Sequence, residues 1–126
     1  MKTLYLSDLD GTLLNSNERI SEYTALTINN FVKSGGCFSY ATARSIVTAS
    51  KATKASAALQ LKSMLGCEKL VMFGDGRNDL SLFAVADEKY AMSNAVPELK
   101  EISTAVIDSN NNDGVAKWIS KHLVLT

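Results

Sequence analysis

Two aspartates separated by one residue stand where an apolar stretch ends, in the sequence SDLDGTLL. Because side chains alternate along a strand, Asp8 and Asp10 point to the same side and converge on one ligand. Gly11 lets the backbone of the following turn approach that ligand closely, and exposed N–H groups there can bind phosphate oxygens. Asp, Gly and Thr are also ordinary turn residues, so this stretch alone leaves a polar loop without chemistry as an alternative.

A second acidic stretch, FGDGRND, favours a functional site over a polar loop. Asp75 follows another apolar run and lies between two glycines, with Asn78 and Asp79 one turn later. Carboxylates roughly 4 Å apart repel by about 4 kcal/mol per pair at an effective dielectric constant of about 20, so such a cluster requires a compensating cation. Oxygen ligands beside a phosphate favour Mg²⁺. The two stretches together predict a Mg²⁺ and phosphate site.

The elements that must position these residues alternate between strand and helix. Apolar runs predict strands over residues 3–10, 37–43, 69–76, 89–95 and 103–109. Repeated βα units of this kind predict an α/β fold, a doubly wound and mostly parallel sheet with helices on both faces. In such a sheet the ligand site lies beyond the carboxyl ends of the strands, which is where Asp8, Thr42 and Asp75 fall.

Helices are predicted between these strands. The first is capped by Ser21 and closed at Gly35, and short helices over 97–102 and 114–122 end the chain. The apolar positions of the first helix recur at helical spacing and predict a core-facing stripe of Ala25, Ile28, Phe31 and Val32.

Length and composition restrict the class of protein. A chain of 126 residues, 46% of them hydrophobic, fits one domain over 1–126 with a single core. Thirteen basic and thirteen acidic residues cancel, which disfavours nucleic acid and anionic lipid as partners. No membrane span or signal-peptide pattern stands out, so we expect a cytoplasmic protein. Cys37 and Cys67 lack CxxC spacing and are interpreted as reduced, structural thiols.

Four ordered motifs carry a resemblance to a known family: DLDGT, ATAR, a lysine before a helix in TKASAAL, and GDGRNDL. With AMSNAVPELK and SNNNDGVAKWI, which extend the match over nearly the whole chain, they resemble the haloacid dehalogenase superfamily and within it the Cof-type phosphatases. The resemblance implies a Rossmann-like core and a Mg²⁺-dependent phosphatase. In that family's reaction Asp8 would attack phosphorus to form an aspartyl-phosphate, and Asp10 would protonate the leaving oxygen and then activate water.

Elementary chemistry agrees with that assignment. A carboxylate attacks an anion only where cations cancel the repulsion, and a separate acid–base group divides the reaction into two steps. By resemblance, Asp8, the backbone carbonyl of Asp10 and Asp75 would bind Mg²⁺, and Asp79 would bind it directly or through water.

The resemblance also implies the groups that hold the phosphoryl oxygens. Lys54 would balance charge, and Thr42 would donate a hydrogen bond. Gly11, through backbone N–H groups of its turn, and Ala43 would also belong to the phosphate-binding residues. Asn78 would contact phosphate or Lys54, stabilising charge that spreads in the transition state.

Other polar residues receive weaker interpretations. Arg44 either orients substrate or is an exposed arginine at the sheet edge. His122, Trp118 and Ile119 are interpreted as packing and surface. The three lysines Lys51, Lys62 and Lys69 are interpreted as solvated side chains.

The chain departs from the Cof-type pattern at two places. Ala43 stands where glycine is usual, and only nine residues, the short junction 45–53, separate Arg44 from Lys54 where that branch carries a cap domain. Right-handed crossovers require the next helix to use the opposite face of the sheet. We therefore predict a helix over 54–65 preceded by a linker or remnant lid, with a single helix over 45–65 as the alternative.

Without a cap, substrate contacts and exclusion of water are reduced, so weak and promiscuous hydrolysis of a small phosphorylated metabolite, such as a sugar phosphate, is expected. An exposed apolar rim left by the cap favours a homodimer. Three alternatives remain open from the sequence: a phosphate-accepting receiver-like signalling domain, a Mg²⁺-binding but inactive scaffold, and a phosphomutase. The receiver is disfavoured because its phosphoacceptor aspartate lies near mid-chain.

Overall fold

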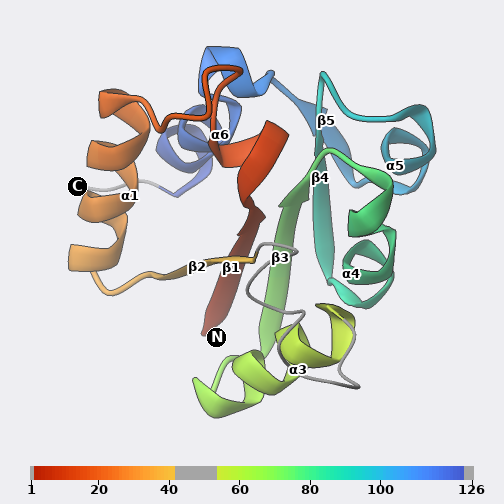
Figure 1. Cartoon of the computed structure of the whole chain (residues 1–126). Helices are drawn as coiled ribbons and strands as arrows, with labels where there is room; N and C mark the ends of the chain where they lie inside the picture. Colours follow the sequence, from red (N-terminus) through yellow and green to blue (C-terminus); the bar gives the residue numbers. More distant parts are fainter. Residues whose placement is uncertain (1, 42–53, 124–126) are drawn as a thin grey trace.

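A parallel sheet forms the centre of the molecule in the computed structural model, which describes residues 2–41 and 54–123. Its five strands follow the order β2-β1-β3-β4-β5 (Figure 1). They are β1 (Thr3–Asp8), β2 (Cys37–Ala41), β3 (Lys69–Gly74), β4 (Glu88–Met92) and β5 (Ala105–Ile107). The predicted α/β fold is confirmed. The strands β1, β3, β4 and β5 end before the predicted runs do, because the polar residues that follow turn away from the hydrogen-bonded ladder.

Helices cover both faces of the sheet (Figure 1). On one face lie α1 (Glu22–Lys33) and α6 (Gly114–His122), and on the other α3 (Lys54–Met64), α4 (Leu80–Val85) and α5 (Pro97–Ile102). The helix predicted over 54–65 is thus present, on the face that right-handed crossovers require. The helix α4 was not predicted. No helix among the described residues combines the length and apolar character needed to cross a membrane.

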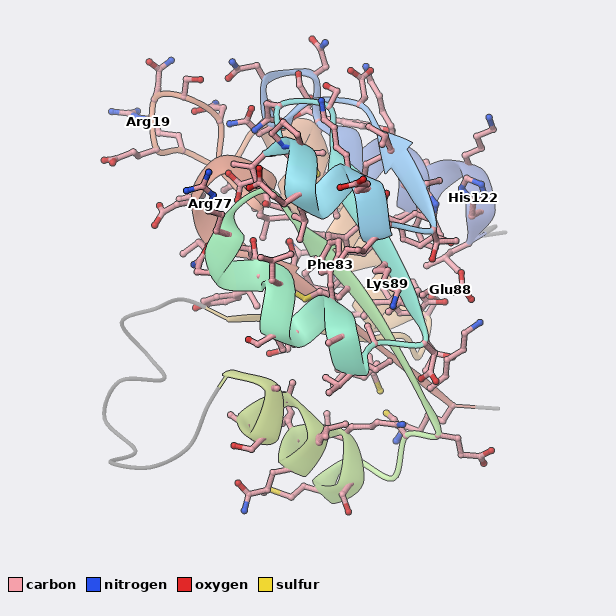
Figure 2. All side chains as sticks on the ribbon, turned by 90° about the vertical axis from the view of Figure 1, so that its right-hand side faces the viewer. Arg19, Arg77, Phe83, Glu88, Lys89 and His122 are labelled. Carbon is pink, nitrogen blue, oxygen red and sulfur yellow. The ribbon has the colours of Figure 1, made fainter. Side chains whose placement is uncertain are left out.

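The central strand β3 is apolar on both sides because both faces of the sheet are covered. Leu70 and Met72 face one layer, where they meet Phe83 of α4, and Val71 and Phe73 face the other. All are at most 1% exposed, and Figure 2 shows Phe83 between α4 and the sheet. Each layer therefore has its own apolar cluster, and β3 contributes to both.

Aromatic side chains fill the layer beneath α6. The Trp118 ring lies 5.3 Å from that of Phe73 and 4.7 Å from that of Tyr90. His122 stacks on Trp118 at 4.7 Å, and Ile119 is fully buried. The interpretation of these helix residues as packing agrees with this arrangement.

The helix α1 begins as predicted, since the Ser21 hydroxyl accepts a hydrogen bond from the N–H of Thr24 at 3.1 Å. Gly35 follows its end with φ +103°. The predicted core-facing stripe is wrong at Val32, which is 48% exposed. The side of α1 that faces the core carries Thr24 instead, which is buried. The Thr24 hydroxyl donates to Oδ1 of Asp113 at 3.1 Å, which satisfies this buried polar group.

The two cysteines are free thiols, as predicted. Cys67 is buried, and half-buried Cys37 packs against the same cluster beneath α3. Burial raises the pKa of the Cys67 thiol, and the neighbouring Cys37 raises that pKa further. A raised pKa keeps Cys67 protonated at neutral pH, consistent with a structural thiol.

Candidate active site

Three carboxylates meet at the carboxyl edge of the sheet, where β1 and β3 end side by side. Asp8 is the last residue of β1 and is buried, whereas Asp75 follows β3 and is half-buried. Asp79 is fully buried in the next turn. One oxygen from each residue lies within 4.8 Å of the other two. The structure thus brings together these three residues from the two acidic stretches.

A helical turn over Leu9–Leu13 brings Asp10 and Gly11 to the same edge. Asp10 is exposed and extended within this turn, at φ −70° and ψ 131°, and Gly11 adopts φ +75°. A Cβ atom on Gly11 would lie 2.0 Å from Oδ2 of Asp75. Both the positive φ and this close approach require glycine, so the backbone turn and the carboxylate form one tightly fitted unit.

Thr12 connects the turn to the carboxylate cluster. Its hydroxyl is buried and donates to Oδ1 of Asp75 at 3.2 Å. This bond orients Asp75, whose other oxygen faces Gly11. This contact was not predicted, because Thr12 and Asp75 lie 63 positions apart in the sequence.

Asp79 holds the loop that follows β3. Its Oδ2 accepts hydrogen bonds from the backbone N–H groups of Asp75 at 3.0 Å and Gly76 at 3.1 Å. Such charge-assisted bonds stabilise a buried carboxylate. A Cβ atom on Gly74 would lie 2.8 Å from the same oxygen, so the strand leaves just enough room for this side chain. Asp79 is therefore a loop anchor as well as a candidate ligand.

The polar residues between Asp75 and Asp79 face outward. Asn78 is exposed, and a Cβ atom on Gly76 would lie 2.6 Å from its Oδ1. Arg77, labelled on the turn before α4 in Figure 2, donates from Nε to Oε2 of Glu98 at 2.8 Å. The phosphate contact expected of Asn78 stays a prediction.

Several predicted site residues lie outside the described part of the chain. These are Thr42, Ala43 and Arg44, together with the side chain of Lys54, whose backbone begins α3. The junction 45–53 and the alternative of one helix over 45–65 fall in the same segment. The roles assigned to these residues stay predictions.

Two asparagines for which no role was predicted also contact the turn after β1. Asn94 donates from Nδ2 to the carbonyl of Gly11 at 2.9 Å, and Asn110 donates from Nδ2 to the carbonyl of Leu14 at 3.0 Å. The available signal was their place in the loops that follow the fourth and fifth strands, at the edge where the carboxylates converge.

Comparison with known proteins defines the class to which this fold and site belong. A sequence model of haloacid dehalogenase-like hydrolases matches residues 5–65 and 46–119. The chain belongs to this family, as the motifs predicted.

The similar curated proteins include phosphatases. The chain is 44% identical over 72 residues to a phosphoglycolate phosphatase of Sulfurisphaera tokodaii, which covers 56% of this chain and 32% of that protein. It is also 44% identical over 72 residues to the 5-amino-6-(5-phospho-D-ribitylamino)uracil phosphatase YwtE of Bacillus subtilis, over 56% of this chain and 25% of that protein. The matches thus span about a third or less of these relatives. They do not favour the receiver-like alternative.

Solved structures confirm the fold. A haloacid dehalogenase-like hydrolase from Bacteroides thetaiotaomicron superposes with a TM-score of 0.84 at 16% identity, covering 96% of this chain and 99% of that one. A 3-deoxy-D-manno-octulosonate 8-phosphate phosphatase from Moraxella catarrhalis, solved with magnesium, phosphate and KDO, gives a TM-score of 0.71 at 18% identity and covers 91% and 82% of the two chains. At such identities the likeness is one of architecture.

Proposed function

We propose that this protein is a Mg²⁺-dependent phosphatase that hydrolyses small phosphate monoesters through an aspartyl-phosphate on Asp8. The observation that carries the proposal is the meeting of Asp8, Asp75 and Asp79 within 4.8 Å, beside the close-fitting Gly11 turn. Family membership supports the reaction class.

The donor set fits Mg²⁺. Carboxylate oxygens are hard ligands, and their mutual repulsion favours a divalent cation between them. Asp8 and Asp75 would hold the ion with the backbone carbonyl of Asp10, and Asp79 would hold it directly or through water. Bound there, Mg²⁺ would supply charge neutralisation and polarise a phosphoryl oxygen.

The chain's own residues would carry the bond changes in two steps. In the first, a carboxylate oxygen of Asp8 forms a bond to phosphorus, the ester P–O bond breaks, and the protonated Asp10 side chain gives its proton to the leaving alcohol oxygen. In the second, Asp10 takes a proton from water, the water oxygen attacks phosphorus, and the Asp8–phosphate bond breaks to release inorganic phosphate. Asp10 ends protonated, so the cycle closes.

The phosphoryl oxygens would be held by groups around that reaction centre. We assign backbone N–H groups at Gly11 and Ala43, the Thr42 hydroxyl, the Lys54 ammonium and the Asn78 amide to this task. The exposed position of Asn78 leaves its amide accessible to a phosphate.

The substrate class proposed is a small phosphorylated metabolite, with sugar phosphates as the first choice. The curated relatives are named for small phosphorylated compounds, which supports the class without specifying the compound. The single core domain with a short junction at 45–53, weak and promiscuous turnover, a homodimer and a cytoplasmic location stay predictions.

The decisive experiment is steady-state hydrolysis of p-nitrophenyl phosphate with and without Mg²⁺, using wild type, Asp8→Asn and Asp87→Asn. Asp87 directly precedes β4, at the opposite end of the parallel sheet from the cluster, so the same substitution there controls for handling and contaminating phosphatase. Metal-dependent turnover that is lost in Asp8→Asn and kept in Asp87→Asn supports the proposal. A folded wild type that binds Mg²⁺ but does not turn over contradicts it and leaves the inactive scaffold.

A further inference from the structure

Asn94 lies in the loop after β4 and contacts backbone groups on two other segments. Its Nδ2 donates to the carbonyl of Gly11 at 2.9 Å, and its Oδ1 accepts from the N–H of Asn110 at 3.2 Å. A carbonyl can only accept and a backbone N–H can only donate, so these two partners fix which end of the amide is oxygen. A side chain with a donor and an acceptor at this spacing is needed to make both bonds.

Asn110 continues the same network. It begins a short turn, Asn110–Asn112, and is 8% exposed. Its Nδ2 donates to the carbonyl of Leu14 at 3.0 Å. The next residue, Asn111, accepts from the N–H of Ser16 at 2.8 Å. The loops after β4 and β5 therefore bind the backbone carbonyls of Gly11 and Leu14 and the N–H of Ser16.

The turn after β1 depends on such outside contacts because its interior is not a regular helix. Asp10 is extended and Gly11 has φ +75°, so these residues interrupt the repeating helical ladder. The closing bond within the turn runs from the N–H of Leu14 to the carbonyl of Leu9 at 2.9 Å. Asn94 binds the turn at Gly11, next to Asp10, and Asn110 binds it at Leu14, where the turn closes.

We propose that Asn94 and Asn110 are positioning residues that hold the turn carrying Asp10 in the conformation needed for proton transfer. This inference rests on the proposed function and deepens it. Both ends of the Asn94 amide are engaged with backbone, so it acts through the turn and leaves the phosphoryl group to other residues. Displacement of a catalytic group by a fraction of an ångström lowers turnover more than it weakens substrate binding.

The kinetic test compares Asn94→Ala, Asn110→Ala and the double variant in p-nitrophenyl phosphate hydrolysis. Asn112→Ala is the matched control, because Asn112 belongs to the same run but donates to Oδ1 of Asp108 at 3.1 Å. We expect kcat to fall about tenfold, which corresponds to about 1.4 kcal/mol in the activation barrier, with KM within about twofold. The double variant should lose less than the product of the single losses, because both residues secure one turn.

Hydrogen exchange gives a readout that does not depend on activity. In Asn94→Ala and Asn110→Ala, the N–H of Leu14 should exchange faster while amides of β3 and β4 stay protected, and Asn112→Ala should match wild type. This result supports the positioning role of Asn94 and Asn110 even if the wild-type protein shows no turnover. Absence of turnover would contradict the proposed function and not this role. Unchanged hydrogen exchange in both variants would overturn the positioning role. A raised KM with unchanged kcat would show that Asn94 contacts substrate instead.

Discussion

The two ends of the sheet both carry ionised side chains, but they use them in opposite ways. At the carboxyl end, Asp8, Asp75 and Asp79 bring like charges within 4.8 Å. At the amino end, Glu88 at the start of β4 pairs with Lys69 at the start of β3 and accepts from the Tyr90 hydroxyl. Figure 2 shows Glu88 well apart from Arg77, which marks the site end.

The consequences for protonation differ accordingly. The Lys69 hydrogen bond, followed by that of Tyr90, holds the pKa of Glu88 below its usual value, and Glu88 raises the pKa of Lys69. Burial, and then Glu88, raises the pKa of Tyr90. Opposite charges stabilise each other there, whereas like charges in a cluster repel, which supports the proposed binding of a cation between the three aspartates.

The largest effect at the carboxyl end of the sheet is expected for Gly11→Ala. A Cβ atom placed 2.0 Å from Oδ2 of Asp75 must push the turn or the carboxylate aside, and the positive φ adds strain. We expect turnover to fall about a hundredfold or more, as for a displacement of roughly 1 Å at a catalytic group. The measurement is kcat/KM for p-nitrophenyl phosphate, together with a circular dichroism spectrum that shows the fold is retained. Gly35→Ala, at φ +103° but with open space around it, is the control, and it should strain α1 without changing turnover.

Asp75→Asn should separate repulsion from metal binding. Saturation with Mg²⁺ at about 100 times the dissociation constant should stabilise wild type by about 2.7 kcal/mol, and Asp75→Asn should lose most of this gain. Without Mg²⁺, removal of one like charge should stabilise the variant by about 1 kcal/mol. Urea unfolding with and without Mg²⁺ measures both numbers. An equal gain in the free energy of unfolding on addition of Mg²⁺ in the two proteins would show that Asp75 is not a metal ligand.

Glu88→Gln should have the opposite sign at the other end. Loss of the pair with Lys69 should lower the free energy of unfolding by about 1 kcal/mol at neutral pH, whether or not Mg²⁺ is present. Because the pKa of Glu88 lies below its usual 4.5, this stabilisation is present above that pH and is lost as the pH falls through the folded-state value. Thermal unfolding across acidic pH should therefore show the wild-type advantage shrinking below 4.5. A constant difference at all pH values would contradict the ionic origin.

Arg77→Ala should have the smallest effect although Arg77 borders the site. Its partner is Glu98, and both side chains are largely in water, at 77% and 47% exposure. Exposed pairs of this kind contribute about 0.2–1 kcal/mol. Thermal unfolding and kcat should stay close to wild type, and a large loss of kcat would place Arg77 in the substrate site instead.

The sequence was sufficient for the parallel α/β sheet and for the meeting of Asp8, Asp75 and Asp79, because apolar runs that end in polar residues specify where parallel strands terminate. It was insufficient for the contacts of Thr12, Asn94 and Asn110, whose partners lie 63, 83 and 96 positions away. Such bonds depend on how loops fold over one another after the sheet has formed.

The predictions for Val32 and Lys69 also failed because of partners that are distant in sequence. Hydrophobicity favoured Val32 as a core residue, but the partner Asp113 let Thr24 take the buried side of α1. Lys69 was interpreted as solvated, whereas Glu88 on the adjacent strand captures it. In both cases a partner distant in sequence reversed the preference of the isolated residue.

The strand order has a consequence for how the chain acquires its structure on the ribosome. β1 lies between β2 and β3 in the sheet, yet its pairing with β3 runs from Thr3 with Lys69 onward, so this second neighbour is synthesised much later. Until then one edge of β1 exposes unpaired backbone groups to solvent and to other nascent chains. Closure of the sheet by β3 removes that edge and in the same event brings Asp75 to Asp8. The acidic cluster therefore forms only when β3 has paired with β1.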